Sequence, residues 1–226
     1  MRLIMANRII VFDIGGTLME FDGMPLNWSE YYQLGFKRLA ESLGCSIADG
    51  EILRSAEILR SYNPRFHERE KEIKPDVIFS ECLKGWNCNY EVQKAANLFF
   101  EGLELKPRIY DGAIKLIAQL KKKGCTVGLY TDLPCGMPDE YFKKCITKLT
   151  DEADFYISNQ SCGYRKPYGQ ILLNTAKRYN TQIKDLIYIG DEEKDRQTAL
   201  HNGCRFLLHK GAVNDFSELY LKCVGG

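Results

Sequence analysis

The pattern of apolar and polar residues divides the chain into three stretches of different character. A short β-branched apolar run at 8–13 is typical of strands buried in parallel sheets. Between about 27 and 104, apolar residues recur at helical spacing with almost no strand signal. From Pro107 onward, short apolar runs alternate with amphipathic helical patterns. This alternation predicts an α/β fold with a doubly wound parallel sheet of Rossmann type.

The individual elements follow from the same pattern. The middle stretch is expected to form helices at 27–44, 46–62, 74–86 and 89–105. The last stretch is expected to form strands at 125–132, 153–159, 185–191 and 204–210, and helices at 111–124, 138–149, 167–180 and 193–203. Gly44, Gly124 and Gly203 are each placed to end a helix, and Pro167 to begin one.

The first strand is separated from the other strands of its sheet by the helical stretch. Residues 1–20 and 106–226 are therefore predicted to form the α/β core domain, and residues 21–105 an inserted α-helical cap domain. Because the insertion follows directly after a strand end, we expect it to cover a site there.

Composition narrows the class of protein further. The 226 residues are 45% hydrophobic, which is enough for a substantial core. The 31 basic and 30 acidic residues nearly cancel, which gives no basic surface to favour a nucleic-acid partner. No apolar run approaches the ~20 residues of a membrane span, and the N-terminus lacks a signal-peptide pattern, so we expect no membrane partner. The nine cysteines are irregularly spaced without a Cys-x-x-Cys pair, which favours free thiols in a cytoplasmic protein.

Acidic residues follow three of the predicted strands. Asp13 ends the first strand, Thr131 and Asp132 end the strand at 125–132, and Asp191 ends the strand at 185–191, with Asp195 close behind. Ligands of open α/β sheets bind beyond the carboxyl ends of strands, so these groups are expected to converge. Several carboxylates in one cleft repel each other and need a cation, and oxygen-only ligands favour Mg²⁺.

Lys166 lies between the second and third acidic strand ends, in "GYRKPYGQI". A lysine just before Pro167 is placed to balance the acids and to hold a phosphoryl oxygen as a point charge. A Mg²⁺ ion, a free aspartate, a hydroxyl and a lysine together are suited to phosphate chemistry.

These residues resemble four motifs of the haloacid dehalogenase-like (HAD) hydrolases. "IIVFDIGGTL" matches the family's first motif, hhhDxDGT[LV], except at Gly15. "VGLYTD" matches the second motif at Thr131, "GYRKP" the third at Lys166, and "IYIGDEEKD" the fourth, hhhhGDxxxD, at Asp191 and Asp195. The resemblance covers nearly the whole chain and includes a helical cap between the first and second motifs.

The resemblance implies a phosphatase for a small phosphorylated metabolite. Asp13 would attack phosphorus and form an aspartyl-phosphate, with Thr131 and Lys166 as the other catalytic residues. Mg²⁺ would be held by Asp13, the backbone carbonyl of Gly15 and Asp191, with Asp195 orienting Lys166 or a metal-bound water. The substrate would contact Gly16, Thr17, Thr131, Asp132 and Lys166. The oligomeric state is left open.

Gly15 is the one departure from the first motif. The resemblance implies that an aspartate at this position protonates the leaving oxygen and later deprotonates water, which is worth about 10²–10⁴ in rate. Alkyl phosphates are therefore expected to be poor substrates, and acyl phosphates, aryl phosphates or anhydrides better ones. Glu20, Asp22 or His67 could substitute for the missing acid, and the sequence does not select among them.

Three other interpretations remain open. The protein could be a catalytically impaired relative that binds a phosphorylated ligand or a protein. It could be a dehalogenase, since a halide needs no proton, although dehalogenases of this family typically lose the metal site. "DIGGT" also occurs in the phosphate loop of actin-like sugar kinases, but a β-hairpin should follow it, whereas residues 24–39 have a helical pattern.

Overall fold

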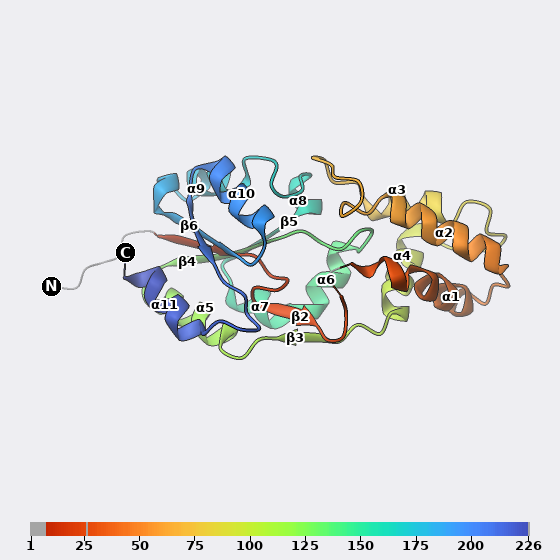
Figure 1. Cartoon of the computed structure of the whole chain (residues 1–226), viewed down its shortest axis with the longest axis horizontal. Coiled ribbons are helices and arrows are strands. Elements are labelled where there is room, and N and C mark those ends of the chain that lie inside the picture. Colours follow the sequence, from red (N-terminus) through yellow and green to blue (C-terminus); the bar gives the residue numbers. More distant parts are fainter. Residues whose placement is uncertain (1–7, 26, 226) are drawn as a thin grey trace. The chain divides into compact units, whose positions relative to one another are not determined.

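The computed structural model describes residues 8–25 and 27–225, which form two compact units (Figure 1). One, the core unit, comprises the chain up to Glu20, Pro107–Asp132 and the chain from Ile146 onward. The other, the helical unit, comprises Phe21–Lys106 and Leu133–Cys145. The segment Leu133–Cys145 follows the second strand-end acid in sequence, yet it groups with the helical unit.

The core unit is built on a five-stranded sheet in the order β5-β4-β1-β6-β7. These strands are β5 (Phe155–Ser158), β4 (Thr126–Thr131), β1 (Ile9–Phe12), β6 (Leu186–Gly190) and β7 (Arg205–Leu208), and every pairing is parallel. β1 lies between β4 and β6, with Phe12 in register with Leu129 and Ile189. The three acid-bearing strands are therefore neighbours, as the expected convergence of their acidic ends requires.

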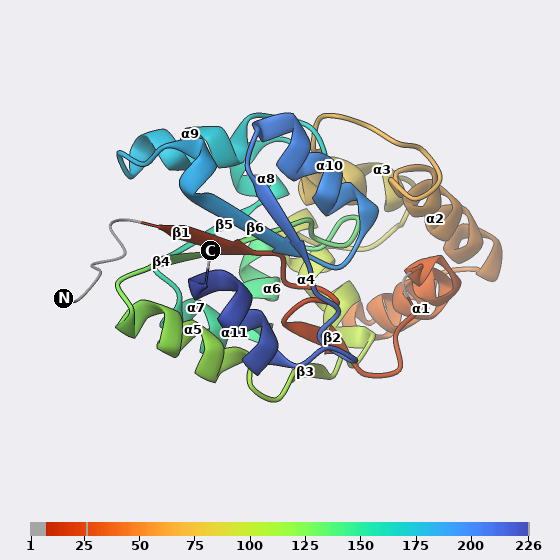
Figure 2. The same cartoon turned by 60° about the vertical axis from the view of Figure 1, so that its left-hand side comes forward.

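Helices cover both faces of this sheet, so the predicted doubly wound α/β fold is confirmed. Figures 1 and 2 both show α9 (Ile171–Arg178) and α10 (Glu193–Asn202) on one face, and α5 (Ala113–Lys122) and α11 (Phe216–Val224) on the other. The remaining core helices are the short α7 (Thr147–Glu152), α8 (Asn159–Cys162) and η2 (Ile183–Asp185). The central strands are buried on both faces, which explains their continuous apolar runs.

The helical unit contains η1 (Trp28–Tyr31), α1 (Tyr32–Leu43), α2 (Asp49–Ser61), α3 (Pro75–Cys82), α4 (Val92–Gly102) and α6 (Asp139–Cys145). Its core is an aromatic cluster in which the Phe36 and Phe99 rings lie 4.7 Å apart between centroids. Gly35 of α1 permits this approach, because a Cβ there would lie 2.4 Å from the Phe99 ring. α1 ends at Gly44, whose φ of 65° allows the left-handed cap.

Several predicted elements need correction. The helix expected at 138–149 is two helices, α6 and α7, which are interrupted at Ile146. The helix expected from Pro167 begins only at Ile171, because Tyr168 N donates to Arg165 O in a turn and Gly169 has a φ of 81°. The short strands β2 (Met19–Phe21) and β3 (Pro107–Ile109), which form a two-stranded sheet, were not predicted, nor was α11.

The expectation that all cysteines are free thiols is wrong for Cys45 and Cys88, which form a disulfide. Their spacing in the sequence gives no signal, because the pair is 43 residues apart and is brought together by the packing of the helices. Cys82, Cys125 and Cys223 are among the described cysteines that form no disulfide. Within residues 8–25 and 27–225, no helix combines the length and apolar character needed to cross a membrane.

Candidate active site

The turn after β1 places Asp13 at the carboxyl end of the sheet. Asp13 N donates to Ile189 O over 2.7 Å, and Ile14 O accepts hydrogen bonds from the backbone of residues 17–19, which closes a tight turn. Gly16 sits in this turn with a φ of 78°. A Cβ on Gly16 would lie 2.3 Å from an Asp191 oxygen, so only glycine fits here without moving the aspartate.

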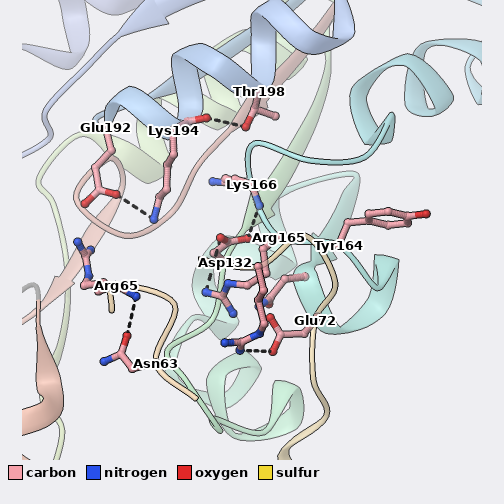
Figure 3. A network of polar contacts seen from close by, with 12 residues as sticks. Asn63, Arg65, Glu72, Asp132, Tyr164, Arg165, Lys166, Glu192, Lys194 and Thr198 are labelled. Atoms are coloured by element: carbon pink, nitrogen blue, oxygen red, sulfur yellow. Dashed lines mark hydrogen bonds and ion pairs between the residues drawn. The ribbon is translucent and has the colours of Figure 1, made fainter. Parts of the chain in front are cut away.

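Lys166 is delivered from the turn that follows α8. Its backbone N–H donates to Asp132 Oδ1 over 3.2 Å, and Asp132 Oδ2 lies 3.6 Å from the Arg165 guanidinium (Figure 3). The Asp132 carboxylate is thus engaged in holding the chain at residues 165 and 166. Sequence reasoning placed Asp132 with the substrate-binding residues, and that role is untested.

The ammonium group of Lys166 joins two carboxylates from different strand ends. Its Nζ donates to Asp13 Oδ1, and to Asp195 Oδ1 over 2.9 Å. The side chains of Lys166 and Asp195 have no exposed surface, and that of Asp13 is 7% exposed. Two of the three N–H bonds of the ammonium are therefore used inside the protein, and no hydrogen bond of the third is seen within residues 8–25 and 27–225.

Asp191 and Thr17 complete the cluster. The Thr17 hydroxyl lies 3.4 Å from Asp13 Oδ2 and 3.3 Å from Asp191 Oδ1. Asp13, Asp191 and Asp195 each present an oxygen within 4.8 Å of the others. Gly190 allows this convergence, because a Cβ there would lie 2.5 Å from Asp195.

The charge of this cluster fits a divalent cation. One buried ammonium faces three carboxylates, so two negative charges are left uncompensated when all three are ionised. Burial, together with the repulsion of Asp195 and Asp191 and against the attraction of Lys166, raises the pKa of Asp13 to about 7. Burial and the neighbouring Asp195 raise the pKa of Asp191 to about 6. Groups that resist ionising together and offer only oxygen donors suit Mg²⁺.

Lys166 itself stays protonated. Burial alone would lower the pKa of its ammonium, but the facing carboxylates of Asp13 and Asp195 outweigh burial and raise it above its ordinary value. The group is therefore a fixed positive charge rather than a proton donor.

Thr131 and Gly15 lie at the edges of this arrangement. Thr131 is the last residue of β4 and is 2% exposed, and its hydroxyl makes none of the hydrogen bonds of the cluster in the described part of the chain. Gly15 is exposed, and a Cβ built on it would meet no atom within 4 Å. The space around position 15 therefore does not require a glycine.

Of the three substitutes for an acid considered from the sequence, Glu20 lies in the core unit. Its Oε1 is paired with Arg108, and its Oε2 accepts a hydrogen bond from the Tyr110 hydroxyl over 2.7 Å. Both oxygens are engaged, which makes Glu20 a poor proton donor in this arrangement. Asp22 and His67 belong to the helical unit.

Sequence reasoning missed two tyrosines beside Lys166. The ring centroids of Tyr130 on β4 and Tyr188 on β6 lie 5.1 and 5.4 Å from Lys166 Nζ. Both appear in the sequence as ordinary apolar strand positions. The available signal is that each tyrosine lies close to a motif aspartate or threonine, where a buried hydroxyl needs a partner.

A family model described as haloacid dehalogenase-like hydrolase matches residues 8–203. The chain is 33% identical over 100 residues to the phosphoglycolate phosphatase of Cereibacter sphaeroides, a match that spans 44% of this chain and 44% of that relative. The chain thus matches less than half the length of this curated relative.

Two solved structures share the fold at low sequence identity. An HAD phosphatase from Thermococcus onnurineus is similar with a TM-score of 0.62 and 17% identity, over 97% of this chain and 98% of that one. An HAD family enzyme from Bacteroides thetaiotaomicron, solved as a magnesium complex, has a TM-score of 0.59 and 18% identity, over 95% of this chain and 98% of that one. At such identities the likeness establishes the fold alone.

Proposed function

Because the chain belongs to the haloacid dehalogenase-like hydrolases, we propose that it is a Mg²⁺-dependent phosphatase acting on a small phosphorylated metabolite. The observation that carries this proposal is the buried contact of Lys166 with both Asp13 and Asp195, beside Asp191 and Thr17. It joins a carboxylate nucleophile, a fixed positive charge and a cation site at one sheet edge. The family match replaces the sugar-kinase interpretation of "DIGGT".

The proposed chemistry is a double displacement on phosphorus. A carboxylate oxygen of Asp13 attacks the phosphorus atom, and the bond from phosphorus to the leaving oxygen breaks with its electron pair. The remaining N–H of Lys166 and the hydroxyl of Thr131 hold the phosphoryl oxygens, and the turn at Gly16 and Thr17 borders the same site. Water then attacks the phosphorus of the aspartyl-phosphate, and the bond from phosphorus to the Asp13 oxygen breaks with its electron pair on that oxygen. One proton of the water passes to solvent and the other leaves with the phosphate, which restores the Asp13 carboxylate.

A bound Mg²⁺ would neutralise charge on the phosphoryl group. Asp13, Asp191 and the backbone carbonyl of Gly15 are proposed to hold it, with Asp195 contributing through water or through Lys166. The oxygen-only donors within 4.8 Å of each other support this assignment. We also propose that residues 1–20 and 106–226 act as the core domain and 21–105 as a cap that selects the substrate.

The proposed reaction lacks a strong proton donor at Gly15. Phosphoglycolate, the substrate named by the curated relatives, has an alkyl leaving group that needs a proton. An acyl or aryl phosphate releases a weakly basic oxygen and is therefore the preferred class of substrate.

A cytoplasmic location remains a prediction, to be checked by cell fractionation.

The test is a substrate panel with Mg²⁺ that contains acetyl phosphate, p-nitrophenyl phosphate, phosphoglycolate and hexose phosphates. Asp13→Asn serves as the matched control, because it keeps the shape of the side chain and removes the nucleophile. Hydrolysis by the wild type and not by Asp13→Asn is expected. Equal activity of both proteins, or none on any phosphate, would contradict the proposal.

The absence of an acid at Gly15 favours one alternative. The protein would then be catalytically impaired and would bind a phosphorylated ligand or a protein partner. In that case phosphate compounds bind with Mg²⁺ present and no member of the panel is hydrolysed. Calorimetric titration of the same compounds separates the two functions. Fluoride or chloride release from haloacids would instead indicate a dehalogenase.

A further inference from the structure

The hydroxyl of Tyr188 is bonded into the charged network around Lys166, although no motif singles this residue out. Tyr188 comes from β6 and is fully buried. Its hydroxyl donates to Asp195 Oδ1 over 3.0 Å, and the other acceptor in reach, Tyr130 O, is farther away at 3.4 Å and uncharged. Asp195 Oδ1 also accepts the hydrogen bond from Lys166 Nζ over 2.9 Å. Tyr188 and Lys166 thus share one carboxylate oxygen.

Asp195 depends on this shared arrangement because it has no contact with water. Its relative exposure is 0%, and its second oxygen accepts the backbone N–H of Glu192 over 3.1 Å in the capping box of α10. A buried carboxylate must be satisfied by donors from the protein. Glu192 N and Tyr188 therefore fix the orientation of Asp195 from two sides, and Lys166 binds to a carboxylate that is already held.

The hydrogen bonds that orient Asp195 also determine where the Lys166 ammonium lies. Asp13 and Asp195 compete for it, and the Tyr130 and Tyr188 rings flank it at 5.1 and 5.4 Å. The Tyr188 hydroxyl takes part of the accepting capacity of Asp195 Oδ1. Without that hydroxyl, Asp195 would bind the ammonium more strongly and draw it away from Asp13.

We propose that Tyr188 is a positioning residue that fixes Asp195 and, through it, the direction in which Lys166 offers its free N–H to a phosphoryl oxygen. This rests on the proposed function in one respect, the binding of phosphate by Lys166. In this proposal Tyr188 acts through its hydrogen bond to Asp195 rather than through a contact with the phosphoryl group.

Tyr130 supplies a matched control. Its ring faces the same ammonium from the adjacent side and is equally buried, but its hydroxyl makes no bond to Asp195 or Lys166 in the described residues. Tyr130→Phe and Tyr188→Phe each remove one buried hydroxyl and keep the ring. Only Tyr188→Phe removes a hydrogen bond to Asp195.

The experiment measures the binding of inorganic phosphate by calorimetry, with Mg²⁺ present and at a temperature where every variant is folded. Tyr188→Phe is expected to weaken phosphate binding about tenfold, the scale of one hydrogen bond to a charged group. Tyr130→Phe is expected to stay within about twofold of the wild type. In an Asp195→Asn background, Tyr188→Phe should have no further effect, because the residue acts through Asp195.

Three results would overturn the proposal: no phosphate binding by the wild type, the same affinity for Tyr188→Phe as for the wild type, or the same fold loss with and without Asp195. If the expected pattern appears while no phosphate compound is hydrolysed, the proposed function fails and the positioning role stands. Should Tyr188→Phe not fold, the wild type provides a second measurement. A slowly exchanging tyrosine hydroxyl proton is expected in its NMR spectrum, and its resonance should move upfield in Asp195→Asn, because a neutral amide oxygen replaces a charged acceptor. Its absence from the wild type counts against the proposal.

Discussion

Replacing Gly15 with aspartate adds a carboxyl group two residues after the proposed nucleophile without disturbing the turn. A Cβ on Gly15 meets no atom within 4 Å, and Gly15 is not among the glycines with positive φ. The substitution therefore removes neither a contact nor a special backbone conformation. We expect the free energy of unfolding to change by less than about 1 kcal/mol.

The expected gain in rate depends on the leaving group. A carboxyl group that protonates the leaving oxygen contributes about 10²–10⁴ in rate where the leaving group is strongly basic. For an alkyl phosphate such as phosphoglycolate, Gly15→Asp should therefore raise kcat/KM by about 10²-fold or more. For acetyl phosphate, whose leaving carboxylate needs no proton, attack on phosphorus should change by less than about threefold.

A series of substituted phenyl phosphates measures this difference directly. The wild type should show kcat/KM values that fall steeply as the leaving phenol becomes more basic. Gly15→Asp should flatten that dependence, because proton transfer removes charge from the leaving oxygen. Gly15→Asn is the matched control, since it has the same size and cannot donate a carboxyl proton, and it should keep the steep dependence.

Water attack on the aspartyl-phosphate also lacks a base in the wild type. The first turnover with acetyl phosphate should therefore be faster than the following ones, with a burst of product close to one equivalent of enzyme. Gly15→Asp should remove the burst. A wild type that already shows a flat dependence on the leaving group would refute the reasoning, because another residue would then supply the acid.

Three further predictions concern the metal, stability and the disulfide. Asp191→Asn should weaken Mg²⁺ binding by about 10–100-fold in calorimetric titration, because it removes one of the charged oxygens of the cluster; unchanged affinity would place the metal elsewhere. His209 is 2% exposed, and burial, aided by the charge of Lys222, lowers its pKa to about 4. In the folded state it therefore stays neutral between pH 6.5 and 4, whereas the unfolded residue takes up a proton near pH 6.5. The lowered pKa of His209 therefore adds on the order of 2–3 kcal/mol to the free energy of unfolding above pH 6.5, and this contribution is lost as the pH falls toward 4. His209→Leu should flatten the pH dependence of urea unfolding in that window. Reduction of the Cys45–Cys88 disulfide should lower the unfolding temperature of the wild type, with a cost of about 2–4 kcal/mol, and should leave Cys45→Ser unaffected; identical melting curves for oxidised and reduced wild type would argue against the bond.

The strands and most helices were predictable because their signals are local. β1, β4, β5, β6 and β7 each lie within a predicted strand, since apolar runs between glycines and polar turns indicate buried parallel strands without reference to the rest of the chain. Elements with weak local signals were missed. β2 and β3 have three residues each, and the turn that delays α9 to Ile171 depends on a hydrogen bond from Tyr168 N to Arg165 O.

The candidate site was predictable as a set of residues but not as a network. The four motifs give Asp13 and Asp191 because each directly follows a strand, Lys166 because it precedes Pro167, and Asp195 because it stands four residues after Asp191. Which oxygen each group uses is decided by side-chain packing. The structure shows that Asp132 accepts a hydrogen bond from the backbone of Lys166 and that both oxygens of Glu20 are engaged. Neither contact can be predicted from the sequence.

The sequence by itself determined the α/β class, the order of the acidic strand ends and the absence of an acid at Gly15, because periodicity and residue identity are local properties. The tertiary structure decided that Lys166 bridges Asp13 and Asp195, that Tyr188 shares an oxygen of Asp195, and that Cys45 pairs with Cys88. Lys166 and Asp13 are 153 residues apart in the chain. Contacts at such separations follow from strand order and register, which are set by the packing of the whole sheet rather than by any short segment.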